Sequence, residues 1–527
     1  MRILLFCLLL SIALPAAADG AACDGGTVFL DGNGNGHRDA REPGLPGVAV
    51  SDGERIVRSD RHGRYVLASG SGHTRFLIKP AGFSAGLRAD GLPDTWMAAP
   101  AASAPSALRQ HGSPAAARGC KDFALQRQRR RPDAPLSVLV FGDPQPKSLI
   151  DVGYYQRDIV APLQGQPGAS LGISLGDLVN DQLSLYPALK AVDATLGIPW
   201  LHAPGNHDLD FDAGSDEASL SSFRHAFGPD TYAWEEAQAN FIVLDDVIYQ
   251  PGQSPAYVGG LREQQFAFLQ AYLDTASKQR LLVLALHIPL FDVPVGVETF
   301  RHGDRERLFA LLRPFPHVLL LSAHTHNQQH YYHGAAEGWH GLTPLHEYNV
   351  GAACGAYWSG IKDADGIPAS TMSDGTPNGY ARLNIADGRV AVRWFAARAP
   401  ADYQMALHAP RVLRRGAYPA YGVYANVFMG DDTTPVQFRV DDGDWRAMRR
   451  VSQADPDLLA ENARDDAAPG LRGVDRSPEA AVSTHLWRGT LPTDLALGEH
   501  TVWVRAGTAG PGQALASTRY RLDEASP

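Results

Sequence analysis

Residues 136–145 read Leu-Ser-Val-Leu-Val-Phe-Gly-Asp-Pro-Gln, an apolar run followed by an acidic residue and an amide. Further apolar runs lie at Leu171–Leu175, Phe241–Leu244, Leu281–Leu286 and Val318–Leu321, with longer amphipathic stretches between them, including Leu261–Leu273 and Arg305–Leu312. Buried strands that alternate with helices are typical of an α/β architecture. We therefore expect an α/β domain from about residue 133.

Side chains that can bind a metal ion follow most of these runs and a shorter one at Trp200-Leu201. The segments concerned are Gly142–Gln145, Gly176–Asp181, Gly205–Asp208, His287 and Ala323–His326. Ligands bind beyond the carboxyl ends of the strands in an open α/β sheet, so these segments are expected to converge on one crevice. One such His or Asp would be a weak signal, whereas five strand ends in order form a strong one.

The order GDPQ, GDLVND, GNHD, HIP and AHTH resembles that of the calcineurin-like metallophosphoesterases. The resemblance covers residues 133–398, and Cys354–Gly360 and Asp374–Tyr380 are similar to one bacterial branch with additional terminal domains. It implies an α/β fold: a metallophosphoesterase β-sandwich flanked by helices, with an N-terminal and a C-terminal all-β domain.

The same resemblance implies two adjacent divalent metal ions. Asp143, Gln145 and His326 would hold the first ion, Asn206, His287 and His324 the second, and Asp177 would bridge them. Because Gln145 replaces a common His with a harder, weaker amide ligand, the metals expected are Mn, Fe or Zn, with Mg as a further candidate. The implied reaction is attack of a metal-bound hydroxide on the phosphorus of a small phosphate mono- or diester.

His207 is expected to act on the substrate without binding metal. It would stabilise charge in the transition state or protonate the leaving oxygen, and either Asp181 or Asp208 could orient it. In the loop Cys354–Gly360, Tyr357 and Trp358 are candidates for contact with substrate. The alternative for these two aromatic residues is packing between domains.

The first 18 residues have the pattern of a secretory signal peptide: Arg2, the apolar run Ile3–Leu14 and the small residues Pro15–Ala18. We expect an exported protein, periplasmic or secreted, and no later transmembrane segment. Cys23 and Cys120 could then form a disulfide in an oxidising compartment, although two free thiols are the alternative.

Residues 19–132 contain short alternating stretches that predict a small antiparallel β-sandwich followed by a linker. Within it, Asp31–Glu42 matches the spacing of a twelve-residue calcium loop and resembles the B-type repeats of bacterial surface proteins. The expected oxygen donors are Asp31, Asn33, Asn35, the His37 carbonyl, Asp39 and Glu42. A solvated Asn/Gly turn is the alternative.

Residues 399–527 lose the helical pattern and predict a second sandwich-like β domain. The chain carries 47 Lys and Arg against 57 Asp and Glu, a net charge of −10. Nucleic acid is therefore not an expected partner, because affinity for its backbone comes from excess Lys and Arg. The alternative to an enzyme is a surface binding or scaffold protein with a vestigial phosphoesterase core, but a decayed site usually loses ligands and only Gln145 is unusual here.

Overall fold

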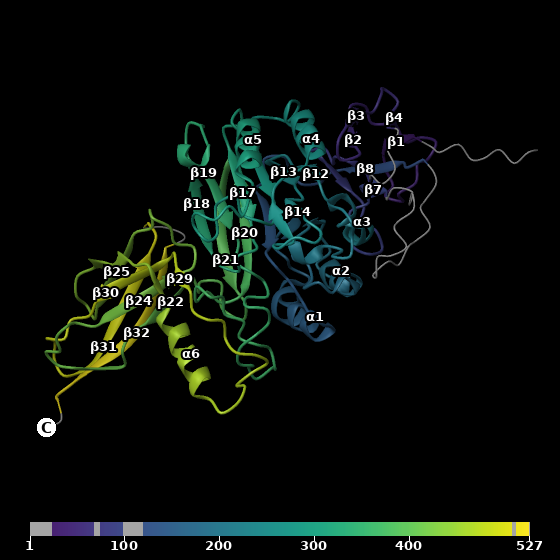
Figure 1. Cartoon of the computed structure of the whole chain (residues 1–527). Helices are drawn as coiled ribbons and strands as arrows, with labels where there is room; N and C mark the ends of the chain where they lie inside the picture. Colours follow the sequence, from purple (N-terminus) through teal and green to yellow (C-terminus); the bar gives the residue numbers. More distant parts are fainter. Residues whose placement is uncertain (1–23, 68–73, 98–119, 509–512, 526–527) are drawn as a thin grey trace, which may run out of the picture.

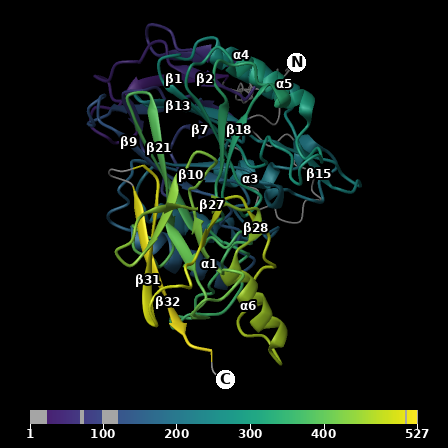
Figure 2. The ribbon, with the colours of Figure 1, turned by 90° about the vertical axis from the view of Figure 1, so that its left-hand side faces the viewer.

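The computed structural model describes residues 24–67, 74–97, 120–508 and 513–525. Figures 1 and 2 place the N-terminal and C-terminal modules at opposite ends of the molecule, with the α/β part between them. The division at residues 132 and 398 stays a prediction. Among the described helices, none combines the length and apolarity needed to cross a bilayer.

The central part contains two mixed sheets that share one buried core. The first has the order β11-β10-β9-β20-β21 and the second the order β12-β13-β16-β17-β19-β18. Their strands are β9 (Leu136–Phe141), β10 (Leu171–Leu175), β11 (Trp200–Ala203), β12 (Tyr232–Glu235), β13 (Ala239–Val243), β16 (Leu281–Ala285), β17 (Val318–Ser322), β18 (Gln329–His333), β19 (Leu345–Asn349), β20 (Gly379–Ala386) and β21 (Arg389–Ala396). This is the α/β fold expected from the sequence.

Helices and a small hairpin connect these strands. They are α1 (Leu149–Tyr155), α2 (Tyr186–Ala194), α3 (Ser221–Phe227), α4 (Glu263–Leu273), α5 (His302–Leu312), the π-helical turn η1 (Gln156–Val160), the 3-10 turns η2 (Ala161–Leu163), η3 (Leu183–Leu185), η4 (Asn206–Asp208), η5 (Asp216–Ala218) and η6 (Ala335–Glu337), and the hairpin β14 (Val247–Tyr249) with β15 (Tyr257–Gly259). Helices α4 and α5 contact each other, as do α1 and α2.

The direction of the strands brings the predicted site together. Strands β9, β10 and β11 are mutually parallel in the first sheet, and β13, β16, β17 and β19 are parallel in the second. The carboxyl ends of parallel strands lie at the same edge of a sheet. Because these strands are largely buried, β10, β16 and β17 read as nearly continuous apolar runs in the sequence. Strand β19, with the sequence Leu-His-Glu-Tyr-Asn, does not.

In its described residues, the N-terminal module has two four-stranded sheets, β4-β1-β8-β6 and β3-β2-β5-β7, with their own small core. The strands are β1 (Gly25–Leu30), β2 (Ala49–Ser51), β3 (Ile56–Arg58), β4 (Arg64–Val66), β5 (Arg75–Leu77), β6 (Phe83–Ala85), β7 (Trp96–Met97) and β8 (Phe123–Arg127). The expectation of a wholly antiparallel module was wrong, because β1 pairs with β8 in parallel. Cys120 is disulfide-bonded, whereas Cys23 lies outside the described residues; the Cys23–Cys120 pairing stays a prediction.

The C-terminal module pairs the sheets β22-β24-β30-β27 and β23-β32-β31-β25-β26 around a separate core. Its strands are β22 (Met405–His408), β23 (Val412–Arg414), β24 (Gly422–Val427), β25 (Val436–Val440), β26 (Arg446–Ala447), β27 (Arg449–Arg450), β28 (Gln453–Ala454), β29 (Val482–Ser483), β30 (Leu486–Thr490), β31 (Gly498–Ala506) and β32 (Ala514–Asp523). Helix α6 (Pro456–Ala467) interrupts them. The absence of helices expected after residue 400 was therefore wrong.

Candidate metal centre

The loops after the parallel strands have an unusual backbone. Of the twelve non-glycine residues with positive φ in the described part of the chain, eight are predicted site residues. They are Asp143, Gln145, Asp177, Asp181, His324, His326, Tyr357 and Trp358. Positive φ is costly for residues with a Cβ atom and persists where the surrounding structure enforces it, often at functional sites.

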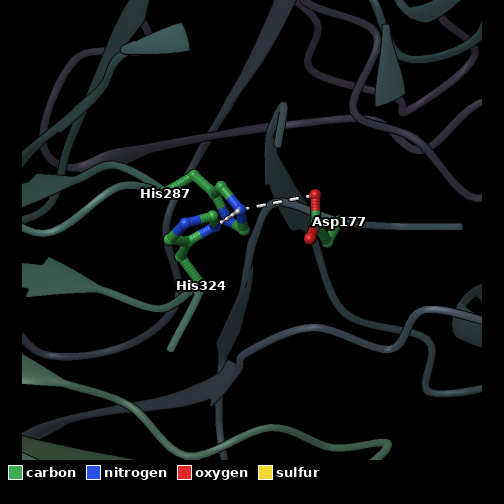
Figure 3. Close-up of side chains that lie close together, drawn as sticks. All are labelled: Asp177, His287 and His324. Carbon is green, nitrogen blue, oxygen red and sulfur yellow. Dashed lines mark hydrogen bonds and ion pairs between the residues drawn. The ribbon is translucent and has the colours of Figure 1, made fainter. Parts of the chain in front are cut away.

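Four predicted ligands, Asp177, Asn206, His287 and His324, form what we call the second group. His287 Nε2 lies 3.3 Å from Asp177 Oδ1, 3.1 Å from Asn206 Oδ1 and 3.2 Å from His324 Nδ1. Figure 3 shows the two imidazole rings side by side, with His287 facing Asp177. His287 donates from Nδ1 to Leu175 O at 2.8 Å, which leaves Nε2 for the group's centre.

The first group consists of Asp143, Gln145, His326 and the shared Asp177. His326 Nε2 lies 3.6 Å from Asp143 Oδ1, and Gln145 Nε2 lies 3.1 Å from Asp177 Oδ2. His326 Nδ1 donates to Gly355 O at 2.7 Å, so Nε2 is again the nitrogen left for a ligand role. A 180° rotation of the Gln145 amide would place its oxygen, the metal-binding atom, towards Asp177.

The donor set of both groups fits divalent cations. Within the described residues, Asp177, His287 and His324, and likewise Asp143, Asp177 and His326, have ligand atoms within 4.8 Å of one another. Asp177 belongs to both sets, as a bridging carboxylate must. The buried Asp143 Oδ1 accepts no hydrogen bond from any described residue, although such an atom is costly to leave unsatisfied.

The electrostatics of the centre favour positive charge from an ion. Burial lowers the pKa of His324 to about 3 and that of His326 to about 4, so both rings are neutral, as metal ligands must be. Burial also opposes charge on His287, but the carboxylates around it, Asp177 foremost, together outweigh burial and raise the pKa of His287 to about 10. Burial raises the pKa of Asp143 to about 8.

His207 contacts Asp181 and not Asp208. Its Nδ1 lies 2.7 Å from Asp181 Oδ1, so Nε2 is left for a substrate. Asp208 is buried instead beneath the loops, where it accepts hydrogen bonds from two backbone N–H groups and from the Tyr186 hydroxyl. The backbone N–H of His207 donates to Asp177 Oδ1 at 2.8 Å, which links the position of this residue to the shared carboxylate.

The two aromatic candidates of the Cys354–Gly360 loop differ in their exposure to solvent. Tyr357 is 45% exposed, and its ring centroid lies 4.5 Å from that of His326, at the edge of the first group. Trp358 is 1% exposed and donates from Nε1 to Pro144 O at 3.0 Å. Trp358 therefore packs beneath the metal loops and does not present a surface to substrate, so the expectation of a substrate contact is kept for Tyr357 alone.

The predicted calcium loop folds around its own side-chain oxygens. Asp31 Oδ1 accepts from Gly34 N at 2.7 Å and Oδ2 from Gly36 N at 3.1 Å. Glu42 returns at the end of the loop, where Oε1 accepts from Gly32 N at 2.8 Å. The other contacts join Asn33 and Asn35 to Asp39, and the His37 N–H to Asn35 Oδ1. The donors thus lie along one short closed loop after β1.

Asp246, which supports the backbone at His287, was not predicted from the sequence. Asp246 is fully buried and its carboxylate accepts hydrogen bonds from His287 N at 3.0 Å and Ile288 N at 2.9 Å. Burial raises the pKa of Asp246 to about 8. The signal was available, because Asp245-Asp246 follows the apolar run Phe241–Leu244 just as the ligands follow theirs.

Comparison with known proteins agrees with this geometry. Models of one family match along the chain: the N terminal of calcineurin-like phosphoesterase at residues 32–108, calcineurin-like phosphoesterase itself at 136–328, and its C terminal at 347–509. The chain belongs to the calcineurin-like metallophosphoesterases, a family of phosphoester hydrolases.

Individual relatives cover less of the chain. The 3′,5′-cyclic adenosine monophosphate phosphodiesterase CpdA of Pseudomonas aeruginosa is 29% identical over 170 residues, 31% of this chain and 56% of that protein. Among solved structures, a dimetal phosphatase from Danio rerio is 14% identical with a TM-score of 0.34, covering 50% of this chain and 97% of that one. A purple acid phosphatase from yellow lupin (Lupinus luteus) is 12% identical with a TM-score of 0.34, covering 66% and 67%.

Proposed function

We propose that the chain is an exported hydrolase of a small phosphate mono- or diester that uses two divalent metal ions. The observation that carries the proposal is the pair of donor groups joined by Asp177 at the ends of parallel strands. The ions expected are Mn, Fe or Zn, with Mg as a further candidate, because the Gln145 amide is a harder donor than imidazole. Export rests on the signal-peptide pattern of residues 1–18, which lie outside the described residues.

Asp177, Asp181 and His207 have different roles in the proposed reaction. When bound, the two cations would polarise phosphoryl oxygens and lower the pKa of a water molecule. Asp177 would hold both cations at a fixed separation, since it is shared by the two groups. His207, oriented by Asp181, would then donate a proton from Nε2 to the leaving oxygen.

Three features bear on the substrate. Tyr357 is half-exposed beside His326, where it could contact the group esterified to phosphate. Lys147 lies with its ammonium 5.2 Å from the Tyr357 ring centroid and adds positive charge near the first group. The resemblance to a cyclic nucleotide phosphodiesterase over part of its length adds a cyclic diester to the substrates that merit a test.

The deciding experiment measures metal content and hydrolysis together. The mature chain is assayed for bound metals, and for turnover of a chromogenic phosphomonoester, its diester analogue and a cyclic nucleotide, with and without added Mn. Two metals per chain with turnover is the expected result. The Asp177→Asn variant should lose two-metal occupancy and activity.

Asp193→Asn is the matched control for that variant. Asp193 is also buried, accepts from Tyr155 Oη at 2.6 Å and lies outside both donor groups, so its substitution should leave metal content unchanged. A wild-type chain that binds no transition metal under any loading condition would overturn the enzyme and favour the scaffold.

We also propose that Asp31–Glu42 binds calcium and stiffens the N-terminal module. The oxygens of Asp31, Asn33, Asn35, Asp39 and Glu42, with the His37 carbonyl, match the donors that calcium prefers. The test is the melting temperature with calcium and with chelator, in the wild type and in Glu42→Ala. Calcium should raise it in the wild type alone, without changing turnover at low temperature. Equal melting temperatures with and without calcium would show that this loop is not a calcium site.

A further inference from the structure

The segment that follows His326 is clamped by a second loop of the central part. Asp374 Oδ2 accepts from Gln328 N at 2.8 Å, and Asn327 Oδ1 accepts in return from Asp374 N at 3.1 Å and from Ser373 Oγ at 2.8 Å. His326 itself has a positive φ of 54°, a conformation that needs support from its surroundings. The position of this ligand therefore depends on the turn at residues 373–376.

The C-terminal module holds that turn from the other side. His485, which directly precedes β30, places Nε2 3.1 Å from Asp374 Oδ2, and both residues are at most 2% exposed. Asn426 of β24 donates from Nδ2 to Asp374 O at 2.9 Å. Figure 1 shows the C-terminal module against the part of the molecule that contains β18 and β21.

The contact is also close at the level of the backbone. Gly375 has a φ of 84°, and a Cβ atom there would lie 2.5 Å from Asp455. Thr484 Oγ1 lies 3.4 Å from Gln328 O, so the residue before His485 touches the clamped segment as well. The turn is thus enclosed between the two modules and cannot move without disturbing both.

His485 is the group best placed to fix the Asp374 carboxylate. A buried carboxylate is costly unless its hydrogen-bond and charge partners remain. The Asp374 carboxylate otherwise accepts hydrogen bonds from the backbone N–H groups of Gln328 and Thr376. Removal of the imidazole would leave the carboxylate without its side-chain partner, and the cheapest relief is a shift of the loop that carries His326.

We propose that His485 of the C-terminal module is a positioning residue for the first metal-binding group, acting through Asp374 and Gln328 on His326. The C-terminal module is then a part of the metal centre's support, not a separate binding domain. The proposal rests on the proposed function, because it takes His326 to be a metal ligand.

The test uses the full-length mature chain with three variants. His485→Leu removes the donor, His485→Gln retains a donor that can reach Asp374, and His500→Gln is the control. His500 is a similarly placed histidine of the same module, 8% exposed and 2.7 Å from Asp441 Oδ2, in a pair that no described contact connects to the metal loops. Each protein is stripped of metal and titrated with Mn while stoichiometry and affinity are measured.

The first metal is expected to bind about 10-fold more weakly in His485→Leu, at the lower end of the effect of losing an outer partner of a ligand. The second metal should bind as in the wild type, and excess Mn should restore kcat at unchanged KM. His485→Gln should bind both metals nearly as the wild type does, and His500→Gln fully so. If His485→Leu does not fold, Asp374→Asn tests the same contact from the central part and should show the same selective loss.

Two results would overturn the proposal. Equal metal affinity in His485→Leu and wild type would show that the contact does not position His326. Equal weakening in His485→Leu and His500→Gln would show a general effect of destabilising the module. Both results count against the positioning role only if the wild type binds two metals. A wild type that binds no metal would instead refute the proposed function, and the inference about His485 would fail with it.

Discussion

Asp181→Asn tests whether His207 delivers a proton. The substitution preserves the shape of the side chain that lies 2.7 Å from His207 Nδ1 and removes its charge. Burial lowers the pKa of His207, but the carboxylates of Asp181 and Asp177 together outweigh burial and the net direction is upward. Because the protonated imidazole is the acid, activity falls as the pH rises through this pKa. The variant should therefore lose activity at a lower pH than the wild type.

The structure sets the size of the shift. Two unit charges about 4 Å apart interact by about 1 kcal/mol in water and about 4 kcal/mol at an effective dielectric constant of about 20. The side chains of Asp181 and His207 are 52% and 28% exposed, so solvent screens the pair and the lower figure applies. About 1 kcal/mol corresponds to about 0.7 pH unit. Bound cations would lower the pKa of His207 in the wild type and in Asp181→Asn alike, so the difference between the two pKa values remains.

The assay is the pH dependence of kcat with two substrates. An alkyl ester has a poor leaving group that needs the proton, whereas a nitrophenolate leaves without one, so the shift should be large only for the alkyl ester. In a His207→Asn background the Asp181→Asn substitution should have no further effect on the alkaline limb. An alkaline limb at the same pH in wild type and Asp181→Asn would refute the assignment of His207 as the proton donor.

Three further outcomes are expected. His207→Ala should slow turnover of the alkyl ester by about 10²- to 10⁴-fold yet keep two metals per chain by elemental analysis; loss of a metal would instead make His207 a ligand. Tyr186→Phe should lower the free energy of unfolding in urea by about 1–2 kcal/mol, because the buried Asp208 Oδ1 loses its 3.0 Å donor, and an unchanged midpoint would contradict this. His500→Gln should be less stable than the wild type below about pH 6.5, the unfolded pKa of histidine. That deficit should vanish as the pH rises through the folded pKa of His500, which burial lowers but Asp441 raises above the ordinary value, and melting curves at acidic and alkaline pH would measure it.

Much of the fold could be predicted from the local composition of the sequence. The apolar run Leu136–Phe141 coincides with β9 and Leu171–Leu175 with β10, because a strand buried on both faces is predominantly apolar. The same rule identified which residues follow each strand, and these are the residues that surround Asp177.

What the sequence left open depends on side-chain direction and on distant pairing. Spacing put both Asp181 and Asp208 near His207, but only the backbone of the loop decides that Asp181 faces the ring. The parallel pairing of β1 with β8 joins segments about a hundred residues apart, which no local pattern encodes. Helix α6 had a readable start, since Asp455 caps its first N–H groups and Pro456 occupies the first turn.

The positive φ angles of the metal loops bear on how the protein would be made in a cell. Asp143, Gln145, Asp177, His324 and His326 all adopt this conformation, at a cost on the order of 1 kcal/mol each. Their sum is comparable to the net stability of an ordinary domain, about 5–15 kcal/mol. Binding of cations to the folded chain would offset that cost by mass action. Metal supply would then govern how much of the protein survives proteolysis, and a culture poor in metal would yield less enzyme as well as less activity per molecule.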